Sequence, residues 1–221
     1  MITAALRSWL VTAIITGITS FAATNIDDIV ILMLFYAQVN ATFRKRHIVA
    51  GQYLGFTALI VASLPGFFGG LIVPRTWIGI LGLVPIAIGI NRLVNREKDG
   101  ARIQTVSGEA DPSPVNTLAS FLSPQTYKVA AVTLANGGDN IGIYVPLFAS
   151  SKLTSLGVIL SVFFLLIGVW CYIAYRLTSL PAIAHVLTRY GQAIVPFVLI
   201  GLGIFILIES GTYRLLLPLI Q

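Results

Sequence analysis

Three aspartates lie inside stretches of sequence that are long and apolar enough to cross a membrane. Asp27 and Asp28 belong to a polar motif at residues 24–28 (TNIDD), and Asp139 belongs to a related motif at 136–140 (NGGDN). An aspartate at the centre of a bilayer costs roughly 2.5–3.5 kcal/mol. A chain retains such residues when protein partners, water or a bound cation compensate the charge, so the two motifs predict a transport site for a cation.

The composition is that of an integral membrane protein. Of the 221 residues, 57% are hydrophobic and 10% are charged, with a mean hydropathy of +0.91, whereas a soluble domain carries about 25% charged residues. The apolar stretches are hydrophobic on all sides, which is typical of lipid-facing helices rather than of barrel strands. We interpret the net charge of +6 as loop charges that orient the protein in the bilayer, and not as a nucleic-acid surface.

Six apolar segments predict an all-α membrane protein with six transmembrane helices. Most of them reach the length of about 20 residues that crosses the hydrocarbon core, and they run over 9–38, 48–73, 77–94, 127–149, 155–177 and 190–209. The first segment is long enough to be broken at its polar motif. Residues 95–126 are polar and contain Gly and Pro, which predicts a cytoplasmic linker between a three-helix unit at 1–94 and a second at 127–221 that ends in a tail.

The basic residues predict the orientation of the chain. With the N-terminus outside, ten of them fall on the inner side: Arg44, Lys45, Arg46, Arg92, Arg96, Lys98, Arg102, Lys128, Arg176 and Arg189. Four fall on the outer side: Arg7, Arg75, Lys152 and Arg214. Because cytoplasmic loops carry the excess of Lys and Arg, we expect both termini outside.

The two halves of the chain are weakly alike. Positions 112 apart match at Ala23 with Ala135 and at Asp27 with Asp139, and Asp28 corresponds to Asn140. Each half contains three segments, an odd number, so the second half enters the membrane in the opposite sense. This pattern predicts two inverted three-helix repeats, with the substrate site near the midplane where interrupted helices of both repeats meet.

The two motifs offer oxygen ligands for a divalent cation. Residues three and four apart share a helix face, and the glycine pair at 137–138 allows the second helix to unwind, which frees backbone carbonyls. The candidate metal ligands are Asp27, Asp28, Asp139, Asn25, Asn136 and Asn140. Two other roles stay open. The asparagines can join helices by hydrogen bonds, and one of the adjacent aspartates can carry a proton while the other binds metal.

Four further polar residues are candidates for lining the pathway: Thr24, Gln52, Tyr144 and Glu209. Thr24 lies beside the first aspartates, and Gln52 lies just inside the second segment. Tyrosines at the edge of a polar motif commonly anchor or pack a helix, which is the alternative for Tyr144. Glu209 ends the last segment, where a solvated carboxylate is ordinary.

At residues 21–29 (FAATNIDDI), 50–55 (AGQYLG) and 134–146 (LANGGDNIGIYVP), the chain resembles the cadmium-resistance transporter family, which belongs to the lysine-exporter superfamily. The resemblance covers most of the chain except the linker. It implies a multi-pass protein of the inner cell membrane that exports divalent cadmium and is not an enzyme. It also implies that the asparagines and aspartates of the two motifs line the pathway, without a resident cofactor.

The residues alone do not identify the substrate. Cadmium favours thiolates, whereas Asp and Asn oxygens suit manganese or calcium, and the only cysteine is Cys171. An exporter of amino acids or of another small organic cation is an alternative, but no basic residue lies near the motifs in the sequence, which favours an inorganic cation. A divalent-cation channel is a second alternative. Proton exchange as the driving force and a homodimeric assembly are compatible with the chain.

Overall fold

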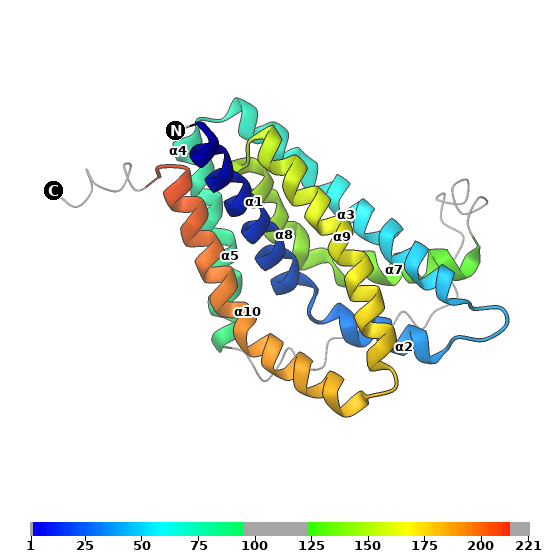
Figure 1. Cartoon of the computed structure of the whole chain (residues 1–221). Helices are drawn as coiled ribbons and strands as arrows, with labels where there is room; N and C mark the ends of the chain where they lie inside the picture. The colour runs from blue at the N-terminus through cyan, green and yellow to red at the C-terminus, as the bar shows by residue number, and fades with distance from the viewer. Residues whose placement is uncertain (1, 95–122, 213–221) are drawn as a thin grey trace.

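The structure, a computed structural model, describes residues 2–94 and 123–212, and every regular element in these ranges is a helix (Figure 1). The elements are α1 Ile2–Asn25, α2 Asp28–Ala37, α3 Lys45–Ile72, α4 Arg75–Ile78, the 3-10 helix η1 Gly79–Gly82, α5 Leu83–Val94, α7 Pro124–Asn136, α8 Gly138–Ser150, α9 Leu153–Leu177 and α10 Pro181–Glu209. The predicted all-α class is confirmed for these residues. The predicted linker lies outside them up to residue 122, as does the tail beyond 212, and α7 already begins at Pro124.

Three helical stretches are long and apolar enough to span a membrane: α3, α9, and the run Thr76–Val94 through α4, η1 and α5. A fourth results if Ser8–Asn25 and Asp28–Ala37, which are bent by 61°, are counted as one broken span. Helices occupy each of the six expected segments, but three to four spans are supported among the described residues. The count of six, the inverted repeats and the orientation of the termini stay predictions.

The two broken helices, α1–α2 and α7–α8, contact each other within the helix bundle. α1 packs against α9 and α10, and α3 lies along both α7 and α8 (Figure 1). α5 lies along α10 and also contacts α8. The junctions between α1 and α2 and between α7 and α8 therefore face elements from both halves of the chain.

Glycines allow α3 to approach α7 and α8 closely. A Cβ atom on Gly55 would lie 2.7 Å from the carbonyl oxygen of Ala130, and one on Gly51 would lie 2.7 Å from that of Thr126. Farther along α3, a Cβ on Gly66 would collide with the backbone of Val145. Small residues spaced in this way bring helix backbones together in membranes. The contact fixes Gln52, which lies between Gly51 and Gly55, against the second broken helix.

Glycines also hold α5 against α10. A Cβ on Gly82 would lie 2.6 Å from the carbonyl oxygen of Gly203, and one on Gly89 would lie 2.7 Å from that of Pro196. Because the two backbones are in close contact, the position of α5 is defined up to its last turn, which carries Arg92.

The core beside the two junctions consists of aromatic rings. Phe21, Phe56, Tyr144 and Phe163 are at most 1% exposed, and the ring centroids of five pairs among them are 4.9–6.0 Å apart. These are favourable separations for aromatic pairs. The rings give the polar groups beside them a rigid and apolar base.

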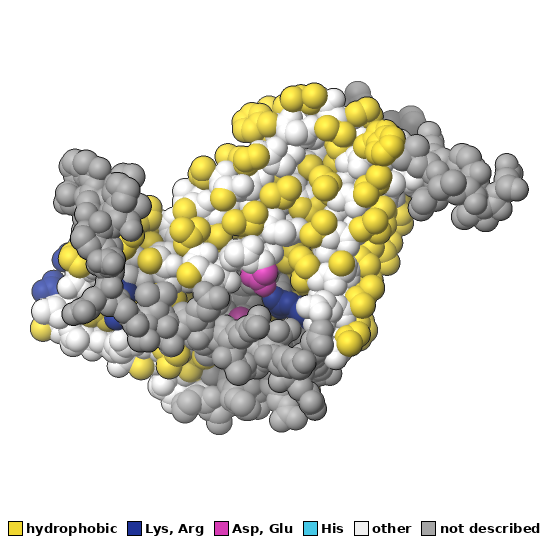
Figure 2. Space-filling view, turned by 180° about the vertical axis from the view of Figure 1, so that it is seen from behind, with side chains coloured by type: hydrophobic (Ala, Val, Ile, Leu, Met, Phe, Trp, Pro, Cys, Tyr) yellow, Lys and Arg dark blue, Asp and Glu magenta, His cyan; other side chains and the backbone are white. Residues whose placement is uncertain are grey.

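The outer surface is also apolar. Phe68, Trp77, Leu165 and Phe197 are all more than half exposed, and Figure 2 shows hydrophobic side chains spread over the visible face. Large exposed apolar surfaces are rare on soluble monomers. They agree with helices that contact lipid.

Candidate cation site

The first polar motif coincides with a break in the helix. α1 ends at Asn25 and α2 begins at Asp28. The Asn25 carbonyl accepts a hydrogen bond from the indole Nε1 of Trp170 (2.8 Å), and the Asn25 side chain donates to the carbonyl of Phe21 (2.8 Å). The last carbonyls of a helix lack partners within it, so the indole of Trp170 gives the Asn25 carbonyl a partner inside an apolar bundle.

The second polar motif coincides with another break. α7 ends at Asn136, Gly137 forms a turn, and α8 begins at Gly138. The Gly137 amide still donates to the carbonyl of Thr133 (2.9 Å), so the interruption is short. The interruption falls at the glycine pair where the sequence predicts unwinding.

Both breaks present an aspartate in the same local position. Asp28 lies in the first turn of α2 and Asp139 lies in the first turn of α8. The N-terminal end of a helix carries a partial positive charge, which stabilises an ionised carboxylate in the first turn. Each broken helix thus keeps one negative group at the start of its second half.

Asp28 is buried and held by neutral amides. Its side chain is 6% exposed. Its Oδ1 atom accepts from Nδ2 of Asn136 (3.0 Å) and its Oδ2 atom accepts from Nε2 of Gln52 (3.3 Å). The Oε1 atom of Gln52 in turn accepts from the hydroxyl of Thr133 (2.7 Å). This chain of hydrogen bonds joins α2, α3 and α7 around one carboxylate.

Asp139 is held by an arginine instead. Nη2 of Arg92 lies 2.5 Å from Oδ2 of Asp139, and Nη1 lies 3.9 Å from Oδ2 of Asp27. The side chains of Arg92, Asp139 and Asp27 are 20%, 40% and 38% exposed, respectively. Figure 2 shows acidic and basic side chains meeting on a face that is otherwise largely apolar. One guanidinium therefore connects a carboxylate of each broken helix.

The expectation that no basic residue lies near the motifs is wrong. Arg92 lies at the inner end of the predicted segment 77–94 and in the last turn of α5, and its contact with Asp139, 47 positions away, is not expected from the sequence. The available signal was an apolar helix that ends in Arg, in a chain with intramembrane carboxylates. The reason to disfavour an organic substrate, which was the lack of a nearby positive charge, therefore no longer holds.

A second polar cluster lies deeper, against the aromatic core. The hydroxyl of Tyr144 is 2.7 Å from the Thr24 hydroxyl and accepts from Nδ2 of Asn25 (3.0 Å). Nδ2 of Asn140 lies 3.4 Å from Oδ1 of Asn25. With the Asn140 amide turned over, its nitrogen donates to the Thr24 carbonyl (3.1 Å) and to Oδ1 of Asp139 (3.3 Å). Tyr144 is fully buried, so it is a core residue and not an interface anchor.

The predicted site residues therefore fall into two hydrogen-bonded groups, the Arg92 ion pairs and one outlier. Thr24, Asn25, Asn140 and Tyr144 form the deeper group, while Asp28, Asn136 and Gln52 form the other, joined by Thr133. Glu209 is exposed at the C-terminal end of α10, beside the start of α1 and away from the breaks (Figure 1). Sequence reasoning missed Thr133, one turn before Asn136, and Trp170, whose position in an apolar segment carries no signal of this role.

No group of three or more His, Cys, Asp and Glu side chains is close enough to hold a metal ion among the described residues. Asp27 and Asp139 face Arg92, and Asp28 faces the amides of Asn136 and Gln52. The oxygen donors of this region thus combine carboxylates with carboxamides. Such a donor set is typical of sites for Ca²⁺ and Mn²⁺.

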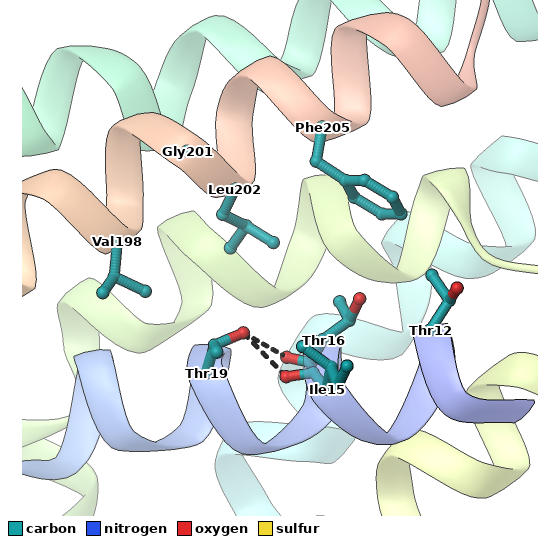
Figure 3. Close-up of a pocket in the computed structure, with 8 residues that line it drawn as sticks. All are labelled: Thr12, Ile15, Thr16, Thr19, Val198, Gly201, Leu202 and Phe205. Carbon is teal, nitrogen blue, oxygen red and sulfur yellow. Dashed lines mark hydrogen bonds between the residues drawn. The ribbon is translucent and has the colours of Figure 1, made fainter.

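A groove elsewhere in the molecule lacks this chemistry. It encloses about 470 Å³ between α1 and α10 and is lined by Thr12, Ile15, Thr16, Thr19, Val198, Gly201, Leu202 and Phe205 (Figure 3). The Thr19 hydroxyl bonds to the carbonyls of Ile15 (2.8 Å) and Thr16 (3.3 Å), and the Thr12 hydroxyl bonds to that of Ser8 (3.0 Å). These hydroxyls are used within α1, so the groove is essentially apolar.

Comparison with protein families assigns the chain. The family model described as cadmium resistance transporter matches residues 21–219, a range that includes both helix breaks and Arg92. A comparison with curated proteins gave no match, and a comparison with solved structures gave none either. A membrane protein with carboxylates at two interrupted helices is compatible with such a transporter. The chain belongs to the cadmium resistance transporter family.

Proposed function

We propose that this protein exports divalent metal cations, with cadmium as the favoured substrate, through the region between the two helix breaks. One observation carries the proposal. Each interrupted helix places an aspartate, Asp27 or Asp139, beside the guanidinium of Arg92, and Asp28 lies in the first turn after the first break. With all groups ionised, Asp27, Asp28, Asp139 and Arg92 give −3 + 1 = −2. One divalent cation balances that charge.

The ligands of the cation are the carboxylates together with the nearest carboxamides. Asn136 and Gln52 orient the carboxylate by donating to it. The oxygen of Asn136 can serve as a further ligand, whereas the oxygen of Gln52 already accepts from Thr133. Asn25 and Asn140 belong to the same proposal from the deeper group. Family membership favours Cd²⁺ as substrate, whereas the oxygen donors favour Mn²⁺ or Ca²⁺, and a transporter that releases its cargo does not need the tightest ligands.

The architecture that fits this proposal is a pair of inverted three-helix repeats with both termini outside. In support, the first break falls at residues 26–27 and the second at 137, one residue from the positions related by the offset of 112. Each break also carries an aspartate in the first turn that follows. In transporters built in this way, interrupted helices from both repeats surround the substrate near the midplane.

The proposal includes exchange of the metal for protons. Asp27 and Asp28 are adjacent in the sequence, so one of them can carry a proton while the other binds metal. When a divalent cation leaves carboxylates in a membrane, another positive charge has to replace it. Protons that enter as metal leaves supply that charge and drive export against a gradient.

One observation favours a second candidate, an exporter of amino acids or another small organic cation. Arg92 is a cation in the region of the motifs, and a guanidinium recognises a substrate carboxylate well. Two aspartates already surround it, and they would repel a carboxylate. The net charge of −2 therefore favours a cation. A divalent-cation channel differs from an exporter because it does not move ions against their concentration gradient.

The test is the cytoplasmic content of Cd²⁺, Mn²⁺, Ca²⁺ and Zn²⁺ in metal-sensitive cells that express wild type, Asp139→Asn or Glu209→Gln. We expect wild type and Glu209→Gln to lower one metal, and Asp139→Asn, at equal abundance in the membrane, to leave it high. If wild type changes none of these metals, the metal-export proposal is wrong. The same assay with amino acids then decides for the second candidate.

A further inference from the structure

We propose that Arg92 is a tethered cation that competes with the transported ion for Asp139 and Asp27, and thereby sets the affinity of the site and promotes release. The inference rests on the proposed function and adds to it a residue that determines how tightly the ion is held. It derives from the ion pairs of Arg92, from the fixed position of α5, and from the different partners of Asp28.

An ion that binds Oδ2 of Asp139 would need the oxygen that the ion pair already uses. Nη2 of Arg92 contacts Oδ2 of Asp139 at 2.5 Å, whereas a carboxylate oxygen binds a divalent cation at about 2.0–2.6 Å. A metal ion on this oxygen would occupy the space of the guanidinium and repel its charge. Arg92 and the ion therefore bind Asp139 alternately.

The backbone of Arg92 is not free to follow the ion. Gly82 and Gly89 hold α5 in contact with the backbone of α10. The side chain of Arg92 is long and partly exposed, so it can leave Asp139 by rotating while α5 stays in place. It remains attached near the carboxylates, and its local concentration is therefore high. This makes it an effective competitor for an ion that arrives from solution.

Asp28 provides a carboxylate that the ion can bind before it displaces Arg92 from Asp139. Its oxygens are held by Asn136 and Gln52, which are neutral, so an ion can approach it without first breaking an ion pair. Arg92 contacts Asp139 closely and Asp27 less closely. We therefore expect the ion to bind first at Asp28 and then to displace Arg92 from Asp139. Return of the guanidinium to Asp139 reverses these steps and releases the ion.

The experiment measures Cd²⁺ and Mn²⁺ binding to the purified full chain by titration calorimetry, in wild type, Arg92→Gln and Lys128→Gln. Lys128 is an exposed residue of α7 with the same charge, so its variant controls for the loss of one positive charge. Loss of the competitor should lower the Kd of Arg92→Gln by roughly 10- to 100-fold and slow efflux from proteoliposomes. Lys128→Gln should bind as wild type does.

An unchanged or weaker affinity of folded Arg92→Gln overturns the inference, and so does an equal gain in Lys128→Gln. If Arg92→Gln is not recovered as folded protein, Arg92→Lys decides. Lysine keeps the charge but loses the two-donor fork, so the Kd should fall by a smaller factor, and an unchanged or higher Kd overturns the inference. Absence of divalent-cation binding in wild type and every variant refutes the proposed function itself.

Discussion

The carboxylates of the two broken helices have different kinds of partner. At the α1–α2 break, Asp28 is buried and accepts hydrogen bonds from two uncharged amides. At the α7–α8 break, Asp139 is 40% exposed and pairs with Arg92. Amide partners fix the geometry of a carboxylate and leave its charge in place, whereas an ion pair cancels the charge and can be exchanged for another cation. One break is therefore suited to hold an ion and the other to control its release.

The largest effect is expected from Asp28→Asn. The variant removes the charge that the amides hold and keeps the volume, so we expect export to fall by at least ~100-fold, while the protein folds because an uncompensated buried charge has been removed. Metal efflux and membrane abundance, measured together, check this. Efflux near the wild-type level would mean that the amide-held carboxylate does not bind the ion.

A larger side chain at Gly55 should disturb the close contact between α3 and α7. In Gly55→Ala, the new Cβ would lie 2.7 Å from both the Ala130 carbonyl oxygen and the Thr133 Cβ atom, which pushes α7 away from α3 at a cost of about 1–3 kcal/mol. Gly69→Ala is the matched control on α3, because no atom outside its own helix turn lies within 4 Å of the position that the added methyl group would take. Thermal unfolding should show a lower midpoint for Gly55→Ala only. Equal midpoints would refute the close contact.

A smaller effect should follow from removal of one amide. Gln52→Ala deletes the hydrogen bond to Asp28 and leaves the Thr133 hydroxyl without this partner, at a cost of about 1–1.5 kcal/mol. We expect the Kd for the transported metal to rise by roughly 5- to 15-fold. Gln38→Ala, at an exposed position after α2, should leave it unchanged. A similar Kd in both variants would exclude Gln52 from the support of Asp28.

The smallest effect is expected in the deeper cluster. Tyr144→Phe keeps the ring in the aromatic core but removes the hydroxyl that joins Thr24 and Asn25, which should cost about 0.5–1.5 kcal/mol of stability. The exposed Tyr172 provides the control Tyr172→Phe. Unfolding midpoints of the two variants are the measurement. Loss of metal export at normal stability would instead assign Tyr144 a direct role in the pathway.

The breaks themselves could be predicted from the sequence because their causes are local. The glycine pair weakens the helix at 137–138, and the adjacent aspartates at the first motif demand polar surroundings within an apolar segment. The meeting of Asn25 with Asn140, and of Asp28 with Asn136, follows from the assumption that two costly polar motifs compensate each other. The hydrogen bond of Asn136 to Asp28 and the close approach of the Asn140 and Asn25 amides agree with that assumption.

The partners of the breaks could not be predicted because they are distant in sequence. Trp170 reaches the Asn25 carbonyl from a helix 145 positions away, and an indole in an apolar segment gives no sign of its acceptor. Arg92 lies at the end of the predicted segment 77–94, and only the packing of α5 against α8 and α10 places it opposite Asp139. Glu209 is a candidate by its charge alone, and it lies outside the clusters.

The central claim is that both broken helices contribute to one cation site. The most direct test is the number of metal ions bound per chain, and their affinity, in purified wild type, Asp28→Asn and Asp139→Asn. We predict one ion in wild type and a strong loss of affinity in each variant, because both carboxylates bind the same ion. Binding of one ion with wild-type affinity in either variant would contradict a shared site.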